Sequence, residues 1–257
     1  MSTAVFTNPA ANPSAVPLST FDEELLRRPW YHTIDLGDGV VTPGIFDHRQ
    51  LLHHYGLPED MTGLSVLDAG AANGFFSFEF ERRGASRVVA VDIPTSKQDM
   101  VVSVDDAFRA EHDHDFDSFD ADKFRLAQRR LGSKVERREL DIYDLSPETV
   151  GMFDIVFCGS VLMHLSDPFR ALRALRSVCR KQLIINSNVL PYTPNEGATA
   201  QFMHPEVMFC FWIPTLECLR KQVAATGCEA RSGGYFTLVH QLEGHEILHG
   251  VVHAQVG

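Results

Sequence analysis

The sequence has few of the features expected of an extracellular or membrane-spanning protein. Its five cysteines form no C-x-x-C pair and are odd in number, which favours free thiols in a reducing compartment over a disulfide framework. No apolar run approaches the roughly 18 residues that a membrane span needs. The first residues lack the basic region of a signal peptide. We therefore expect a cytoplasmic protein with no membrane partner.

Positive charge is also scarce. The chain has 23 Lys and Arg against 34 Asp and Glu, a formal net charge of −11 at pH 7. Such a chain lacks the long-range field that gathers polyanions, so nucleic acid is not an expected partner. Its 257 residues, 44% hydrophobic and 22% charged, fit one large α/β domain with additions.

The most informative stretch is an apolar run that ends in an acid and leads into a loop of small residues. The run before Asp68, the loop 69–74, the apolar stretch 75–80 and a second run ending in Asp92 indicate one βαβ unit. Its small loop residues lie where side chains would obstruct a bound nucleoside. Asp92 follows the loop at the distance from which an acid accepts hydrogen bonds from a ribose diol.

The spacing within this loop is Asp68-x-Gly70-x-Ala72-x-Gly74. It differs from the G-x-G-x-x-G fingerprint of dinucleotide-binding proteins and resembles motif I of class I S-adenosylmethionine-dependent methyltransferases, an acid followed by three alternating small residues. Ala72 departs from the commonest middle glycine but leaves room for a ligand. On the loop alone, a βαβ unit that binds a dinucleotide or no ligand stays an alternative.

The ends of two later predicted strands, at Asp141 and at Gly159-Ser160, extend the resemblance. In this family an acid after the third strand accepts from the adenine amino group, and the next backbone N–H meets the ring. The resemblance therefore implies these roles for Asp141 and Ile142. It implies further cofactor contacts from Ile93, Gly159 and Ser160. The cofactor is S-adenosyl-L-methionine, and its product is S-adenosyl-L-homocysteine.

The order of predicted elements indicates an α/β fold, a Rossmann-like seven-stranded methyltransferase sheet. The sheet is expected to be mostly parallel, with a terminal antiparallel strand from the pair 233–239 and 246–254. An N-terminal lid or helical extension, with a helix over 46–55, precedes it. The expected division is a disordered tail at 1–20, the extension at 21–60 and the cofactor-binding methyltransferase domain at 61–257.

The acceptor side is expected on two turn-rich stretches, 30–44 and 188–209, that could close as a lid. His164 follows the fourth predicted strand and is the candidate general base, since histidine titrates near neutral pH. A histidine that only orients the loop is the alternative. The candidate acceptor-pocket residues are Tyr31, His32, Asn188, His204 and Trp212.

Four segments resemble one branch of this family more specifically: 30–34, the loop after Asp68, 161–165 and Phe211-Trp212-x-Pro214. They resemble the branch grouped with tRNA wobble-uridine carboxymethyltransferases, which also holds bacterial small-molecule methyltransferases of natural-product and glycan pathways. The acidic charge and the lack of an evident basic module favour a small acceptor methylated on O, N or C. The tRNA reaction is the main alternative, and a non-catalytic cofactor-binding module is a more remote one.

Two histidine patterns point to metals. His245-Glu246-x-x-His249 matches the H-E-x-x-H of zinc metalloproteases, but the alternation that follows predicts a strand, where residues four apart are too distant to share one metal. His112-x-His114 lies in an acid-rich stretch typical of a solvated face. We therefore expect no resident metal, and a zinc metalloprotease stays a formal alternative.

Overall fold

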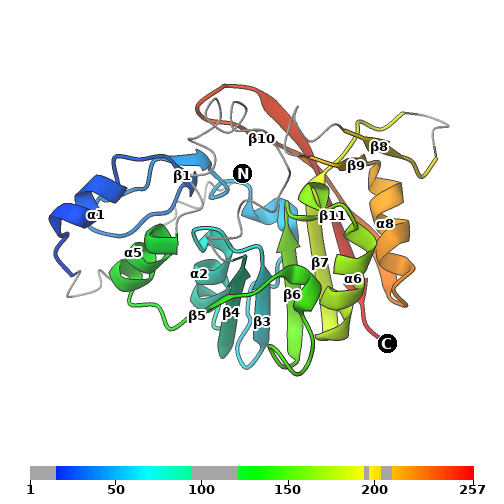
Figure 1. Ribbon diagram of the computed structural model, residues 1–257, viewed down its shortest axis with the longest axis horizontal. Helices are drawn as coiled ribbons and strands as arrows, with labels where there is room; N and C mark the ends of the chain where they lie inside the picture. Colours follow the sequence, from blue (N-terminus) through cyan, green and yellow to red (C-terminus); the bar gives the residue numbers. More distant parts are fainter. Residues whose placement is uncertain (1–15, 94–120, 194–196, 204–209) are drawn as a thin grey trace, which may run out of the picture.

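A computed structural model describes residues 16–93, 121–193, 197–203 and 210–257. Seven strands form its main sheet: β3 (Ser65–Ala69), β4 (Arg87–Asp92), β5 (Glu136–Glu139), β6 (Phe153–Gly159), β7 (Cys179–Asn188), β10 (Glu229–Val239) and β11 (Glu246–Gln255). Their order is β10-β11-β7-β6-β3-β4-β5, and β11 is antiparallel to both of its neighbours (Figure 1). The remaining pairs are parallel. The predicted fold class is confirmed.

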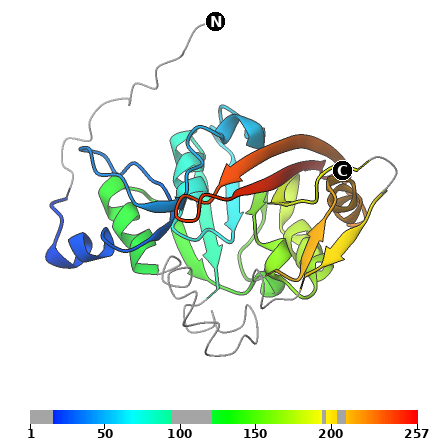
Figure 2. The same ribbon diagram turned by 90° about the horizontal axis from the view of Figure 1, so that it is seen from above.

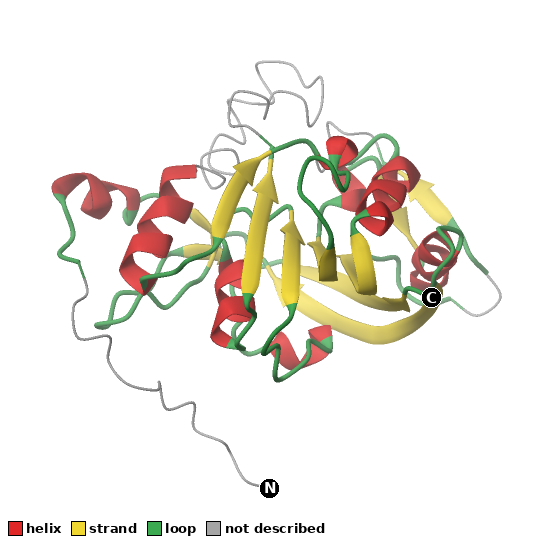
Figure 3. Ribbon diagram, turned by 90° about the horizontal axis from the view of Figure 1, so that it is seen from below, coloured by secondary structure: helices red, strands yellow, loops and turns green. Residues whose placement is uncertain are grey.

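Helices and two small strand pairs surround this sheet (Figure 3). The α-helices within the described residues are α1 (Thr20–Leu25), α2 (Phe75–Arg82), α5 (Ala121–Leu131), α6 (Pro168–Ser177) and α8 (Leu216–Ala224). The 3-10 helices there are η1 (Leu52–Tyr55), η3 (Ile142–Asp144) and η4 (Leu162–His164). The small pairs are β1 (Trp30–His32) with β2 (Gly44–Phe46), and β8 (Ala200–Phe202) with β9 (Trp212–Pro214). Among the described helices, none has the length and apolar character needed to cross a bilayer.

Alternate residues of the central strands belong to different hydrophobic clusters. In β6, Ile155 and Phe157 are buried in the cluster that includes Phe76 of α2. Val156 lies in the second cluster, with Leu172 of α6. Both faces of the sheet are therefore covered, which explains why these strands appear in the sequence as continuous apolar runs.

The N-terminal extension packs beside α5 (Figure 2). Lys123 Nζ donates to the Pro29 carbonyl at 2.7 Å, and an Arg129 guanidinium nitrogen donates to an Asp22 carboxylate oxygen at 2.7 Å. The Trp30 side chain is fully buried, and its Nε1 donates to the Leu25 carbonyl at 3.0 Å. The helical extension directly before the predicted lid stretch 30–44 is therefore anchored to the domain.

The predicted helix over 46–55 is wrong. Phe46 ends β2, which pairs with β1, and helical structure begins only at η1. Asp47 explains the delay, because its carboxylate accepts from the Arg49 backbone N–H at 3.1 Å and from the Arg49 side chain. Such a local turn competes with a helix start. Gly56 ends η1 in the left-handed conformation, at φ 57°, at the predicted stop.

Candidate functional site

Four parallel strand ends meet at one edge of the sheet. Ala69 of β3 pairs with Val91 and with Cys158, and Asp92 of β4 pairs with Glu139 of β5. Open α/β sheets bind ligands outside the carboxyl ends of their strands. The sequence-predicted cofactor residues at or just beyond these ends are Asp68, Gly70, Ala72, Gly74, Asp92, Ile93, Asp141, Ile142, Gly159 and Ser160.

The loop after β3 places three of its predicted residues in left-handed backbone conformations. The φ angles are 84° at Gly70, 47° at Ala72 and 91° at Gly74. A Cβ on Gly70 would lie 2.1 Å from Val161 Cγ2, and one on Gly74 would lie 2.6 Å from Phe124 Cε2. The glycines are thus required by backbone conformation and by packing against protein side chains. This reason differs from the predicted one, which was room for a nucleoside.

Asp92 fastens the loop to the end of β4. Its Oδ2 accepts from the Ala72 backbone N–H at 2.6 Å, and its Oδ1 accepts from the Ile93 N–H at 2.8 Å. Burial raises the pKa of this carboxyl, although the two backbone donors oppose the shift. Each carboxylate oxygen carries a second lone pair, so Asp92 has acceptor capacity left for a ligand hydroxyl.

Asp68 lies beneath the loop and is 1% exposed. Ser77, in the first turn of α2, donates its hydroxyl to Asp68 Oδ2 at 2.5 Å. Burial raises the pKa of Asp68 to about 7, and the nearby charge of Asp92 adds to the rise. The hydrogen bond between Asp68 and Ser77 therefore links β3 to α2. Sequence reasoning missed Ser77, whose signal is a lone hydroxyl within an otherwise apolar phenylalanine run.

Asp141 begins the turn after β5. It caps η3, and its Oδ1 accepts from the Tyr143 backbone N–H at 2.9 Å. Ile142 is the first residue of η3 and is 6% exposed. The first N–H groups of a helix have no partner within that helix. The turn can therefore offer a backbone donor beside an acid, as the resemblance implies for an adenine ring.

Ser160, directly after Gly159 at the end of β6, has φ 54°. Its N–H donates to the Asn186 carbonyl at 2.9 Å, and its hydroxyl donates to Asn186 Oδ1 at 3.2 Å. The same Oδ1 lies 3.2 Å from His249 Nδ1. Asn186 therefore joins β6, β7 and β11 at the site edge, and sequence reasoning missed it because its partners are distant in the chain.

His164 ends η4 and is partly buried, and its backbone N–H donates to the Val161 carbonyl at 2.9 Å. The start of β9 docks on this turn. Phe211 N–H donates to the Met163 carbonyl at 2.7 Å, and Trp212 Nε1 donates to the Ser166 carbonyl at 3.3 Å. The fold thus brings together the segments of His164 and Trp212.

The segment of Tyr31 and His32 is attached to the cofactor loop. Asn73 Oδ1 accepts from the Tyr31 N–H at 2.7 Å and from the His32 N–H at 3.3 Å. His32 is 4% exposed, its ring lies among those of His48 and Phe76, and its Nδ1 has no hydrogen-bond partner among the described residues. Burial lowers its pKa to about 3, so the imidazole is neutral.

The remaining predicted acceptor residues are Asn188 and His204. Asn188 ends β7 opposite His249 and is 5% exposed, and within the described chain its Oδ1 has no hydrogen-bond partner. His204 lies outside the described residues, as do His112 and His114. Asn188 therefore borders the same strand ends as Asn186, whereas no position follows for His204.

The H-E-x-x-H motif lies at the start of strand β11, and a strand was predicted there. His245 directly precedes β11, Glu246 pairs with Val239, and His249 is 2% exposed within the sheet. Burial lowers the His249 pKa to about 4. The two histidines lie four residues apart in extended chain, so they do not form the one-face pair of a helical zinc site.

Comparisons with known proteins agree with this geometry. Residues 67–185 match the family model described as a methyltransferase domain. The tRNA U34 carboxymethyltransferase of Campylobacter hominis is 30% identical over 120 residues, 46% of this chain and 33% of the relative. The ubiquinone biosynthesis O-methyltransferase of Xanthomonas euvesicatoria is 28% identical over 141 residues, 55% of this chain and 49% of the relative.

Among solved structures, the N-terminal domain of EvdMO1 with SAH bound superposes with a TM-score of 0.59 at 16% identity, covering 91% of this chain and 94% of that one. It supports the fold. The chain spans only about a third to a half of the length of the two curated relatives. The family match shows a methyltransferase domain over residues 67–185, and the sheet order accords with that match.

Proposed function

We propose that the protein transfers a methyl group from S-adenosyl-L-methionine to an O, N or C atom of a small-molecule acceptor. The observation that carries this proposal is the gathering of Asp92, Asp141 and the left-handed loop Gly70–Gly74 at one edge of a parallel sheet. The acceptor pathway, in natural-product or glycan metabolism, belongs to the same proposal.

The residues present fit this cofactor. Asp92 keeps acceptor capacity for the ribose diol, because each of its oxygens is engaged by one backbone N–H. Asp141 and the Ile142 N–H would meet the adenine, and Gly70, Gly159 and Ser160 would flank the remainder. The bound cofactor supplies an electrophilic methyl group on its sulfonium.

The chain then has to align the acceptor, exclude water and remove a proton where the acceptor requires it. Among the described histidines, His32 and His249 are poor bases, because burial lowers their pKa values to about 3 and about 4. His164 is only partly buried and stands on the turn after β6. We assign it the general base, with Tyr31, Asn188 and Trp212 as acceptor-side residues.

A binding and turnover experiment tests this proposal. S-Adenosylhomocysteine is titrated calorimetrically into the protein, and its release from S-adenosylmethionine is followed with phenol, sugar and amine acceptors. Binding of the cofactor with turnover on one acceptor class is the expected result. Binding without turnover on any class would favour a non-catalytic cofactor-binding module. No binding of either cofactor form would refute the proposal.

The tRNA wobble-uridine reaction is the second candidate, and the Campylobacter relative favours it. The net charge of −11 argues against it, because few phosphates can be neutralised. Binding to bulk tRNA should therefore be weak and should disappear at modest salt. Tight, salt-resistant binding of one tRNA species would favour the wobble-uridine reaction over a small acceptor.

A further inference from the structure

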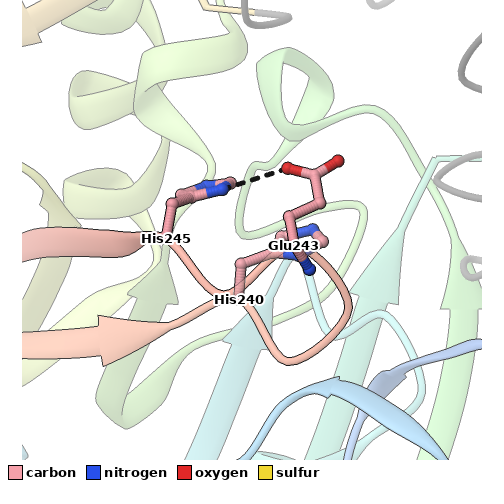
Figure 4. Close-up of side chains that lie close together, drawn as sticks. All are labelled: His240, Glu243 and His245. Atoms are coloured by element: carbon pink, nitrogen blue, oxygen red, sulfur yellow. Dashed lines mark hydrogen bonds and ion pairs between the residues drawn. The ribbon is translucent and has the colours of Figure 1, made fainter.

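The turn between β10 and β11 gathers three side chains that can ligate a metal: His240, Glu243 and His245. One ligand atom from each lies within 4.8 Å of the others (Figure 4). The cluster shares only His245 with the H-E-x-x-H motif. The ligands come from a hairpin turn, so this site differs in kind from a helical metalloprotease site.

The turn holds the three side chains close together. His240 N–H donates to the His245 carbonyl at 3.0 Å, and Gly244 N–H donates to the His240 carbonyl at 2.7 Å, with Gly244 at φ 73°. The two imidazole rings stack at a centroid distance of 4.9 Å and an angle of 19°. A Glu243 carboxylate oxygen lies 3.0 Å from His245 Nδ1. The turn thus brings the three side chains near one another before any ion binds.

We propose that His240, Glu243 and His245 bind one divalent transition-metal ion of the zinc class. Two ligand atoms of a tetrahedral zinc site lie about 3.4 Å apart. The widest separation between ligand atoms in the cluster therefore has to shorten by more than about 1 Å when the ion binds. The Glu243 and His245 side chains, each 46% exposed, can rotate to do so. Two imidazoles and one carboxylate suit Zn²⁺ better than Mg²⁺ or Ca²⁺, which favour all-oxygen sites.

Metal binding competes with two interactions of the ion-free turn. Glu243 N–H lies 3.2 Å from His240 Nδ1, which makes that nitrogen an acceptor and leaves the proton of a neutral ring on Nε2. The 3.0 Å contact between the Glu243 carboxylate and His245 Nδ1 must also open. An exposed contact of this kind contributes little to stability, so its loss is a small obstacle.

The site lies on the edge of the sheet that carries the cofactor residues. β10 runs parallel to β7, so the turn after Val239 emerges at the carboxyl ends of the strands. Gln241 N–H donates to the Ile45 carbonyl at 2.8 Å. The Phe46 ring meets His240 at 5.3 Å and Tyr31 at 5.0 Å. The Phe46 ring would therefore separate the ion from Tyr31. The protein supplies three ligands, so a fourth coordination position would be open to water.

Zinc titration of the full-length, chelator-treated protein tests the site without any need for turnover. We expect one equivalent of Zn²⁺ to bind by calorimetry and Mg²⁺ to bind far more weakly. Glu243→Gln and His245→Ala should each lower the zinc affinity at least about tenfold, since each removes one ligand. Both side chains are exposed, so circular dichroism should show an unchanged fold.

The matched control is His53→Ala, because the His53 and His54 rings form a second histidine pair, with centroids 3.9 Å apart. This variant should bind zinc like the parent. The proposal is overturned if the parent binds no zinc, if Glu243→Gln and His245→Ala both bind it like the parent, or if His53→Ala abolishes binding. Zinc should also raise the melting temperature of the parent and of His53→Ala, and at equal zinc concentration it should raise that of Glu243→Gln by less.

Discussion

The two halves of the candidate site are built in different ways. The proposed cofactor half comes mostly from residues 68–142, with Gly159 and Ser160 added at the end of β6, and Asp92 and Asp141 accept hydrogen bonds from backbone N–H groups within it. The acceptor half draws Tyr31, His164, Asn188 and Trp212 from four separate segments. A local motif thus determines the geometry of the cofactor half, whereas tertiary packing determines that of the acceptor half. Substitutions in the two halves should therefore have different effects.

His164→Ala should give the largest effect, and it should separate the halves. Loss of a general base lowers turnover by about 10²–10⁴-fold. The affinity for S-adenosylhomocysteine should stay within about tenfold, because we assign His164 to the acceptor side. Release of S-adenosylhomocysteine measures turnover, and His53→Ala is the control. Unchanged turnover would mean that His164 only orients the turn after β6.

Asp68 should make the cofactor half sensitive to pH. Its pKa is raised to about 7 in the folded protein from 3.8, chiefly by burial. Between these values the folded state keeps a proton that the unfolded state loses, so stability falls as pH rises from about 4 to 7. At about 1.4 kcal/mol per pKa unit, the loss amounts to at most about 4 kcal/mol.

Urea unfolding of the parent and of Asp68→Asn across this pH range is the measurement. The variant lacks the titration and should show a shallower decline. Asp154→Asn is the control, because the Asp154 pKa is lowered to about 2, chiefly by the Ser65 backbone N–H, and its stabilisation is lost only in stronger acid. Parallel pH profiles for the parent and Asp68→Asn would show that Asp68 is not a buried, proton-holding carboxyl.

Gly74→Ala should destabilise the fold as well as the cofactor site. The new Cβ would meet the Phe124 and Phe78 rings at 2.6 and 2.7 Å, in a backbone conformation that disfavours side chains. Overpacking and strain together should cost about 2–4 kcal/mol of unfolding free energy. Gly39 has a similar φ of 77° and nothing near its added Cβ, so Gly39→Ala measures the cost of the backbone conformation alone. Equal losses in the two variants would remove packing as the reason for Gly74.

Asp92→Ala should give the smallest of these effects and the most local one. Loss of its hydrogen bonds to the cofactor should weaken S-adenosylhomocysteine binding by roughly 1–3 kcal/mol in calorimetry. Asp35→Ala removes another carboxylate, one that accepts from the Gly37 N–H in an exposed turn, and should bind like the parent. Wild-type affinity in Asp92→Ala would place the ribose elsewhere.

The same contrast explains how much the sequence could predict. The βαβ unit and the acids at Asp92 and Asp141 were predictable, because strand ends and loops depend on neighbouring residues. The burial of His32 was not, because the rings of His48 and Phe76 that cover it belong to other elements. The wrong helix over 46–55 has the same origin, since β2 exists only through pairing with β1.

Hydrogen exchange with and without S-adenosylhomocysteine tests the central claim most directly. The cofactor alone should slow exchange at the loop 70–74, at Asp92 and Ile93 and at Ile142. It should leave η4 and β9 largely unchanged, because they belong to the acceptor half. Slowed exchange at η4 and β9 without any change in the loop or at Ile93 would contradict the assignment of the two halves.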